Sequence, residues 1–266
     1  MSNRNGYEHG VPCWITAVHP DTGAAVPFYE GVFGWETEDL MDADDPGRYV
    51  ICRLRGHEVA ALVSDHPSAP SPPTAIWGTN VWVDSADETA ARATQAGGEL
   101  LGEPFDSPGG GRVAVLADPA GAVFCAWQPQ GRRGAQVVNE PGAWAMSQLL
   151  TPDPDGAKAF YGTVFGWTTE SFDAGGAEVT LFRVPGYVGG EPSQPVSREV
   201  VAAMAGAPGP ARWAIDFWID DAEAAAARAT ELGGDVVQAP HDAPPFRRAV
   251  LADPQGATFS VSQLLL

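Results

Sequence analysis

One aspartate on a strand-like segment is the side chain best suited to chemistry in this sequence. In the run "AIDFWI", alternation puts Ala214 and Trp218 on the face of Asp216, while Ile215 and Phe217 take the other face. A carboxylate among apolar side chains has a raised pKa and could act as a general base. The alternative is a hydrogen-bonded structural aspartate, or one at a wet rim. Asp216 is therefore a catalytic candidate with a structural alternative.

Three basic residues are further candidates. Arg112 and Arg247 match each other, because each precedes an Asp-Pro pair at the start of a strand-like run. Either could hold a ligand carboxylate or phenolate, or pair with a surface acid instead. His241 lies in "APHDAPPFRR", which we predict to be a loop. It could shuttle a proton there or simply be solvated.

The other histidines and the cysteines show no catalytic or metal-binding spacing. We predict loops or strand ends for all five histidines, and no Ser-His-Asp or Cys-His pair can be argued from the spacing. The three cysteines form an odd, sparse set that favours reduced thiols in a cytoplasmic protein. The residues concerned, besides His241, are His9, His19, His57, His66, Cys13, Cys52 and Cys125.

Charge and hydropathy limit the possible partners. The 266 residues include 34 Asp and Glu but 15 Lys and Arg, which gives a net charge of −19. Phosphate backbones would be repelled, so we expect no nucleic acid partner. No apolar run is long enough to cross a bilayer and the N-terminus lacks an apolar signal core. We therefore expect a cytoplasmic protein without a membrane partner.

The chain consists of two homologous halves. "FYEGVFGW" at 28–35 returns as "FYGTVFGW" at 160–167, and "ARATQAGGELLGEP" at 91–104 returns as "ARATELGGDVVQAP" at 227–240. Each half closes on similar runs, "RVAVLADPAGAVFCAW" and "RRAVLADPQGATFSVS". Gly, Pro and polar residues fill the joint at 129–142, as is typical of a linker.

Each half divides again into two units of the form β-α-β-β-β. Each helix is expected between an acidic residue and a glycine, which suit the two ends of a helix. Strand-like runs precede and follow each helix, although the last strand of the third unit cannot be placed within 185–211. The helix boundaries are Asp21 to Gly34, Asp84 to Gly97, Asp153 to Gly166 and Asp220 to Gly233.

These features resemble the vicinal oxygen chelate superfamily, which includes glyoxalase I, bleomycin-resistance proteins and extradiol dioxygenases. The resemblance rests on the paired βαβββ modules, the "FYxxxFGW" motif and the closing "DPxG". "PCW" near the start and "NEPG" at the joint look like a tandem, glyoxalase-like subgroup found in antibiotic-producing bacteria. The resemblance implies an α+β fold of two domains, each a mixed sheet curled into a cup and backed by helices.

The same resemblance places the domain boundaries. The first domain is expected at 10–128, with modules at about 10–65 and 76–128, and the linker at 129–142. The second domain is expected at 143–266, with modules at about 143–205 and 212–265.

Metal-using members of this superfamily hold the ion with His, Glu or Gln on the first and last strands of each module. Counting from the motifs, none of the matching positions has such a residue. A fourth position falls near Ala60–Ala61 in the first domain and cannot be placed in the second. We therefore expect no metal and no other cofactor. The matching positions are Trp14, Gly78, Cys125, Met146, Ala214 and Ser260.

Strand alternation assigns a lining to each cup, and the two linings differ. Three tryptophans of the first cup suit a flat, apolar ligand oriented by Asn80 and Thr16, or else simply fill the barrel. The first lining is Trp14, Thr16, Val18, Gly78, Asn80, Trp82, Cys125 and Trp127. The second is Trp144, Met146, Gln148, Ala214, Asp216, Trp218, Ser260 and Ser262. Except Val18, Gly78, Ala214 and Ser262, all are ligand-binding candidates, with Arg112 and Arg247 expected at the mouths.

Three functions are compatible with these features. The first is a metal-independent protein that captures a small aromatic metabolite or antibiotic, as bleomycin-resistance proteins do. The second is a metal-free enzyme of secondary metabolism in which Asp216 and His241 move protons. The third, which the matching positions disfavour, is a metal-dependent lyase or dioxygenase. The expected assembly is a monomer or homodimer, and exchange of modules between domains stays open.

Overall fold

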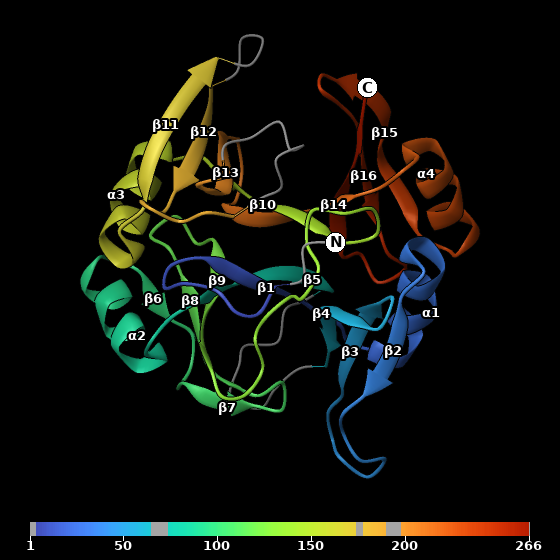
Figure 1. The fold of residues 1–266 in the computed structure, drawn as a ribbon, viewed down its shortest axis with the longest axis horizontal. Helices are drawn as coiled ribbons and strands as arrows, with labels where there is room; N and C mark the ends of the chain where they lie inside the picture. Colours follow the sequence, from blue (N-terminus) through green and yellow to red (C-terminus); the bar gives the residue numbers. More distant parts are fainter. Residues whose placement is uncertain (1–3, 65–73, 174–177, 190–197, 266) are drawn as a thin grey trace.

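The chain forms two curled sheets, one from each half (Figure 1). The computed structural model describes residues 4–64, 74–173, 178–189 and 198–265. The sheets lie back to back, and hydroxyls of Thr79 and Ser147 meet between them at 2.6 Å. Their concave faces turn away from each other, and we call them the first cup and the second cup (Figure 1). The predicted α+β class with two domains is confirmed.

The first sheet has the strand order β2-β3-β4-β1-β5-β9-β8-β6, with β7 beside β8. Antiparallel pairing of β1 with β5 joins the first two modules at its centre. Modules therefore pair within this half rather than between halves. The strands are β1 Pro12–Val18, β2 Glu36–Asp39, β3 Tyr49–Leu54, β4 His57–Val63, β5 Ile76–Trp82, β6 Glu99–Leu100, β7 Phe105–Ser107, β8 Gly111–Ala117 and β9 Val123–Pro129.

The second sheet repeats this order as β11-β12-β13-β10-β14-β17-β16-β15. The last strand of the third module, which the sequence does not locate, is β13, and it pairs in parallel with β10. The strands are β10 Trp144–Thr151, β11 Thr168–Asp173, β12 Glu178–Arg183, β13 Val200–Gly206, β14 Arg212–Trp218, β15 Asp235–Ala243, β16 Phe246–Ala252 and β17 Thr258–Leu264.

Each module has one helix, and two of the four predicted helix starts are displaced. Asp21 and Asp153 cap their helices, but Ser85 and Asp221 cap the others, one residue beyond the expected position. In the described part of the chain, none of the helices has the length and hydropathy needed to span a membrane. The helices are α1 Thr22–Phe33, α2 Ala86–Gln95, α3 Pro154–Phe165 and α4 Ala222–Glu231.

Helices of the two halves pack side by side, α1 with α4 and α2 with α3 (Figure 1). The core is therefore shared between halves. Phe28 and Phe160 of the repeated motif are each 2% exposed. Each contacts a glycine of the opposite half, because a Cβ on Gly234 would lie 2.7 Å from the Phe28 ring and one on Gly98 2.8 Å from the Phe160 ring. Only glycine fits these two places without a shift.

The tyrosine of the motif reaches across to the Asp-Pro turn of the other half. Tyr29 donates its hydroxyl to Asp253 Oδ2 at 2.9 Å, and Tyr161 donates to Asp118 Oδ2 at 3.1 Å. Each tyrosine oxygen in turn accepts an indole N–H, from Trp77 and from Trp213. Burial and the nearby carboxylate raise the pKa of both phenols, so they remain donors. The two motifs of the repeat thus bind each other between halves.

The tryptophan that ends the motif makes a second cross-half bond. Trp35 Nε1 donates to the Gly142 carbonyl and Trp167 Nε1 donates to the Gly10 carbonyl, both at 2.7 Å. His19 adds a bond without a counterpart in the other half. It lies just after β1, is fully buried, and its Nε2 lies 2.6 Å from Asp253 Oδ2.

Candidate functional site

Strand register places most of the predicted lining residues on the two cup faces. In the first cup, Trp14 lies opposite Asn80, Thr16 opposite Gly78, Asn80 beside Cys125 and Trp82 beside Trp127. In the second cup, the corresponding pairs are Met146 with Asp216, Gln148 with Ala214, Asp216 with Ser260, and Trp218 with Ser262.

Trp144 departs from this pattern. A bulge between Trp144 and Met146 sets Trp144 opposite Phe217, a fully buried residue on the back of the sheet. The alternation that assigned Trp144 to the cup is broken at this point. The expected cup position of Trp144 is therefore not supported, and its side chain is 6% exposed.

The first cup is packed by its own side chains. Trp14, Asn80 and Trp127 are 4–5% exposed. A Cβ on Gly111 would clash with Trp127 Nε1, and one on Gly109 would clash with the Tyr49 hydroxyl, so this glycine segment closes onto the rings. This packing favours the interpretation that the tryptophans fill the barrel.

The polar groups of the first cup satisfy one another. Asn80 Nδ2 donates to Thr16 Oγ1 at 3.1 Å and to the Trp14 carbonyl at 3.3 Å, so the amide donors of Asn80 are paired within the cup. Burial raises the pKa of the Cys125 thiol to about 12, which makes it a poor nucleophile. Trp82 packs edge-on against Trp127 with ring centres 5.5 Å apart.

The second cup contains a buried carboxylate with incomplete pairing. Asp216 is 8% exposed, and its Oδ1 accepts a 2.8 Å hydrogen bond from Ser262 Oγ. The same oxygen lies 3.3 Å from Arg248 Nη2. Burial raises the pKa of Asp216, although Arg248 and Ser262 lower it in part. The carboxylate therefore holds its proton more readily than an exposed aspartate.

Arg248 is the residue that the sequence reasoning missed. It lies directly opposite Ser262 on β17, which puts it on the cup face, whereas its neighbour Arg247 faces the other way. Arg247 bonds Asp242 at 2.6 Å and also pairs with Glu223 on α4. The pairing of β16 with β17 distinguishes the two arginines.

The matching arginine of the first half is also on the helix side. Arg112 Nε donates to Asp87 on α2 at 2.7 Å, and the guanidinium lies near Asp106. The expectation that Arg112 and Arg247 stand at the cup mouths is therefore wrong, because both face acids of the neighbouring helix. The cup-face neighbour in the first half is Val113, opposite Trp127.

His241 lies in a strand rather than in the predicted loop. It belongs to β15 and stands opposite Arg248 on β16, so the two share the cup side of the sheet. Its Nδ1 lies 3.1 Å from the Ala239 carbonyl. When Nδ1 carries the proton for this bond, Nε2 is free to accept one. Of the other histidines, His66 lies outside the described residues.

The positions that hold a metal in this fold do not fit one here. The fourth position is now placed in both halves, as Ala61 opposite Thr16 and Ala203 opposite Gln148. Of the matching positions, the alanine, glycine, tryptophan and methionine side chains supply none of the donors that divalent cations prefer, Ser260 offers only a neutral hydroxyl, and burial keeps the Cys125 thiol protonated by raising its pKa to about 12. Among the described residues, no three His, Cys, Asp or Glu side chains come together as a possible metal site.

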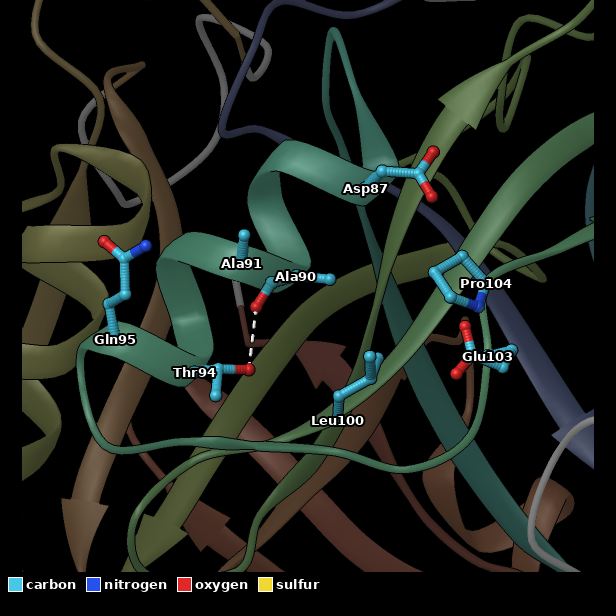
Figure 2. Close-up of a pocket in the computed structure, with 8 residues that line it drawn as sticks. All are labelled: Asp87, Ala90, Ala91, Thr94, Gln95, Leu100, Glu103 and Pro104. Atoms are coloured by element: carbon cyan, nitrogen blue, oxygen red, sulfur yellow. Dashed lines mark hydrogen bonds between the residues drawn. The ribbon is translucent and has the colours of Figure 1, made fainter.

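A separate hollow of about 460 Å³ lies on the outer side of α2, away from both cups. Figure 2 shows small residues of the helix on one wall and two carboxylates, Asp87 and Glu103, at its margin. Thr94 Oγ1, which lines the hollow, donates a hydrogen bond to the Ala90 carbonyl of the same helix at 3.0 Å. The hollow offers carboxylates and no cation among its lining residues, in contrast to the second cup.

Comparison with known proteins now assigns the class. Residues 13–126 match the model of the glyoxalase/bleomycin resistance protein/dioxygenase superfamily, and residues 145–262 match a glyoxalase-like domain. A Mycobacterium tuberculosis protein named "Putative glyoxylase CFP32" is 37% identical over 98% of this chain and 97% of its own. The chain therefore belongs to the glyoxalase/bleomycin resistance protein/dioxygenase superfamily.

Other relatives extend this result. The anthracycline biosynthesis protein DnrV of Streptomyces peucetius is 34% identical, over 96% of this chain and 94% of its own. The Mn(II)-bound glyoxalase from Novosphingobium aromaticivorans shares the fold, with a TM-score of 0.64 and 18% identity. The match covers 97% of this chain and 83% of that chain.

Proposed function

We propose that this protein binds a small aromatic molecule in its second cup without using a metal ion. The observation that carries the proposal is the pairing of buried Asp216 with half-exposed Arg248 inside that cup. A binding site typically combines apolar walls with a few polar groups that orient the ligand. Trp218 and Phe246 provide such walls, with their rings perpendicular and 6.5 Å apart. The family's metal positions supply no suitable donors.

The contrast between the cups supports one binding site per chain. The position of buried Trp14 in the first cup is taken in the second by Met146, which is partly exposed, whereas Trp82 and Cys125 of the first cup are partly exposed like Trp218 and Ser260 of the second. We therefore place the ligand in the second half only, and the first half acts as its scaffold. Relatives named for anthracycline biosynthesis support a role in antibiotic biosynthesis.

A second candidate function is a metal-free enzyme that uses Asp216 as an acid–base group. The raised pKa of this buried carboxylate favours it, because a general base works best when its pKa approaches the working pH. His241, on the same cup side, would be the group that exchanges the proton with solvent. Chemical conversion of the bound compound separates this function from simple capture.

Native mass spectrometry of the protein purified without chelators tests the proposal. The expected spectrum shows the bare chain, or the chain with a single organic adduct, and no stoichiometric metal. One divalent ion per domain would contradict metal-independent binding. An adduct that is released unchanged after incubation supports capture, whereas an altered mass supports the enzyme.

A further inference from the structure

The guanidinium of Arg248 is the least satisfied charged group of the second cup. Its side chain is 32% exposed, and its 3.3 Å contact with Asp216 is longer than the 2.7–2.9 Å of a charge-assisted hydrogen bond. No other hydrogen bond of this guanidinium is present among the residues that the structure describes. Arginine has five N–H donors, so most of them are available to a ligand.

Arg247 shows that this incomplete pairing is specific to the cup side. Arg247 is the next residue on the same strand, and it bonds two carboxylates, Asp242 and Glu223. The chain has 34 acidic residues and 15 Lys and Arg, so acids to pair with Arg248 are plentiful. Within the described part of the chain, Arg248 nevertheless pairs with a single acid, Asp216, whose Oδ1 is already shared with Ser262.

The surroundings of Arg248 suit a flat molecule with polar groups at one edge. Register sets Trp218, Ser262, Arg248 and His241 in a row across four neighbouring strands of the cup. A ring lying against Trp218 would therefore have its edge toward Ser262 and the guanidinium. Asp216, on the same strand as Trp218, accepts through Oδ1, which leaves Oδ2 for a donor of the ligand.

We infer that the second cup is specific for an aromatic hydroxy acid, whose carboxylate or phenolate pairs with Arg248 and whose hydroxyl donates to Asp216. The inference rests on the proposed function and names its ligand class. Since the protein carries a net charge of −19, diffuse electrostatics would repel such an anion. Its binding requires a positioned cation, and Arg248 supplies one.

Fluorescence titration of the full chain with two acid–amide pairs tests this inference. The probes are salicylate with salicylamide, and 1-hydroxy-2-naphthoate with 1-hydroxy-2-naphthamide. The amides keep the ring and the hydroxyl but lack the carboxylate. Each acid is expected to bind at least about tenfold more tightly than its amide, because a hydrogen-bonded ion pair is replaced by a neutral contact.

Variants of the two adjacent arginines locate the effect. Arg248→Met should weaken binding of each acid at least about tenfold and leave the amides unchanged, while Arg248→Lys should lose less because the charge remains. Arg247→Met is the matched control on the opposite face, and it should leave both affinities as they are. Circular dichroism melting of each variant confirms that it is folded.

The outcomes separate the inference from the proposed function. Equal affinity for acids and amides, with no effect of Arg248→Met, would overturn the acidic ligand and leave aromatic binding in place. Failure of all four compounds to bind would overturn both. Acid selectivity that Arg247→Met abolishes and Arg248→Met preserves would also overturn the assignment to the second cup.

Discussion

The charge of Asp216 is the residue-level feature on which the proposed ligand binding and the alternative acid–base function both depend. Its carboxylate is buried, accepts from Ser262 and meets only one guanidinium nitrogen, at 3.3 Å. Since desolvation disfavours the charged form, the folded protein keeps this proton to a higher pH than the unfolded chain does. Once Asp216 is ionised, its carboxylate can accept a hydrogen bond from a ligand hydroxyl.

Replacement of Asp216 by asparagine should change the pH dependence of stability. Burial raises the pKa of Asp216 above its ordinary value of 3.8, so the folded state binds more protons than the unfolded state between those two pKa values. Stability from this group therefore falls as the pH rises through that interval. Asp216→Asn should gain free energy of unfolding relative to the parent as the pH increases from about 3 to 7. Urea unfolding at several pH values measures the difference.

Asp87 provides a control of opposite sign. The hydrogen bond from Arg112 lowers the pKa of Asp87, so its contribution is present at neutral pH and lost as the pH falls below 3.8. Asp87→Asn should therefore lose stability relative to the parent as the pH rises, by a small amount because the pair is exposed. A difference for Asp216→Asn that is constant with pH, or has the same sign as that for Asp87→Asn, would contradict the raised pKa.

At this scale the sequence predicted strand faces better than individual contacts. Alternation correctly put Asp216, Trp218 and Ser262 on one side, because Ile215, Phe217 and Val261 beside them are apolar and buried. It did not distinguish Arg247 from Arg248. The two are adjacent and identical in type, so only the pairing with β17 shows which one faces the cup. His241 was expected in a loop because Pro240 and the prolines that follow resemble turn residues.

At the scale of elements, the glycines that lead into β8 and begin it decide whether the first cup is open. Gly109 and Gly111 allow this segment to lie against Tyr49 and Trp127, where a Cβ would clash. The sequence reasoning identified the three tryptophans but could not choose between a ligand pocket and a filled barrel. The choice depends on how closely the backbone at Gly109 and Gly111 approaches the aromatic rings, and this distance cannot be read from the amino-acid sequence.

Adding a methyl group at Gly111 tests this closure. Gly111→Ala should destabilise the fold by about 1–3 kcal/mol, because its Cβ meets the buried Trp127 indole. Gly78→Ala is the matched control on the same cup face. The nearest atom to its Cβ would be the Thr16 carbonyl oxygen at 3.8 Å, an ordinary contact. Chemical denaturation compares the two, and equal stabilities would show that the first cup has free space.

At the scale of the whole molecule, the repeated "FYxxxFGW" and "DPxG" motifs hold the halves together. The sequence reasoning correctly predicted modules of βαβββ form. The structure puts the partner of each motif in the opposite half, as Tyr29 with Asp253 and Tyr161 with Asp118. The repeat in the sequence indicates that the two tyrosines make equivalent contacts. It does not indicate whether the aspartate that each contacts lies in the same half or in the opposite half.

Removing each tyrosine hydroxyl should weaken this interface unequally. Tyr161→Phe leaves the Trp213 indole without its acceptor and takes the hydroxyl donor from Asp118 Oδ2, at a cost of about 1–3 kcal/mol. Tyr29→Phe does the same to Trp77, but Asp253 Oδ2 keeps His19 at 2.6 Å. The Tyr161 variant should therefore be the less stable in urea unfolding. A more stable Tyr161 variant would contradict this account of His19.

The same strands carry assembly and recognition on alternate residues. On β14, Ile215 and Phe217 point into the shared core, while Ala214, Asp216 and Trp218 line the second cup. Every second position can therefore vary with the ligand while its neighbours stay fixed by the opposite half. Within one strand, the residues that stabilise the fold are thus different from those that can vary. Substitution at the three cup positions of β14 can therefore change what the proposed site binds, while the residues that pack against the opposite half stay the same.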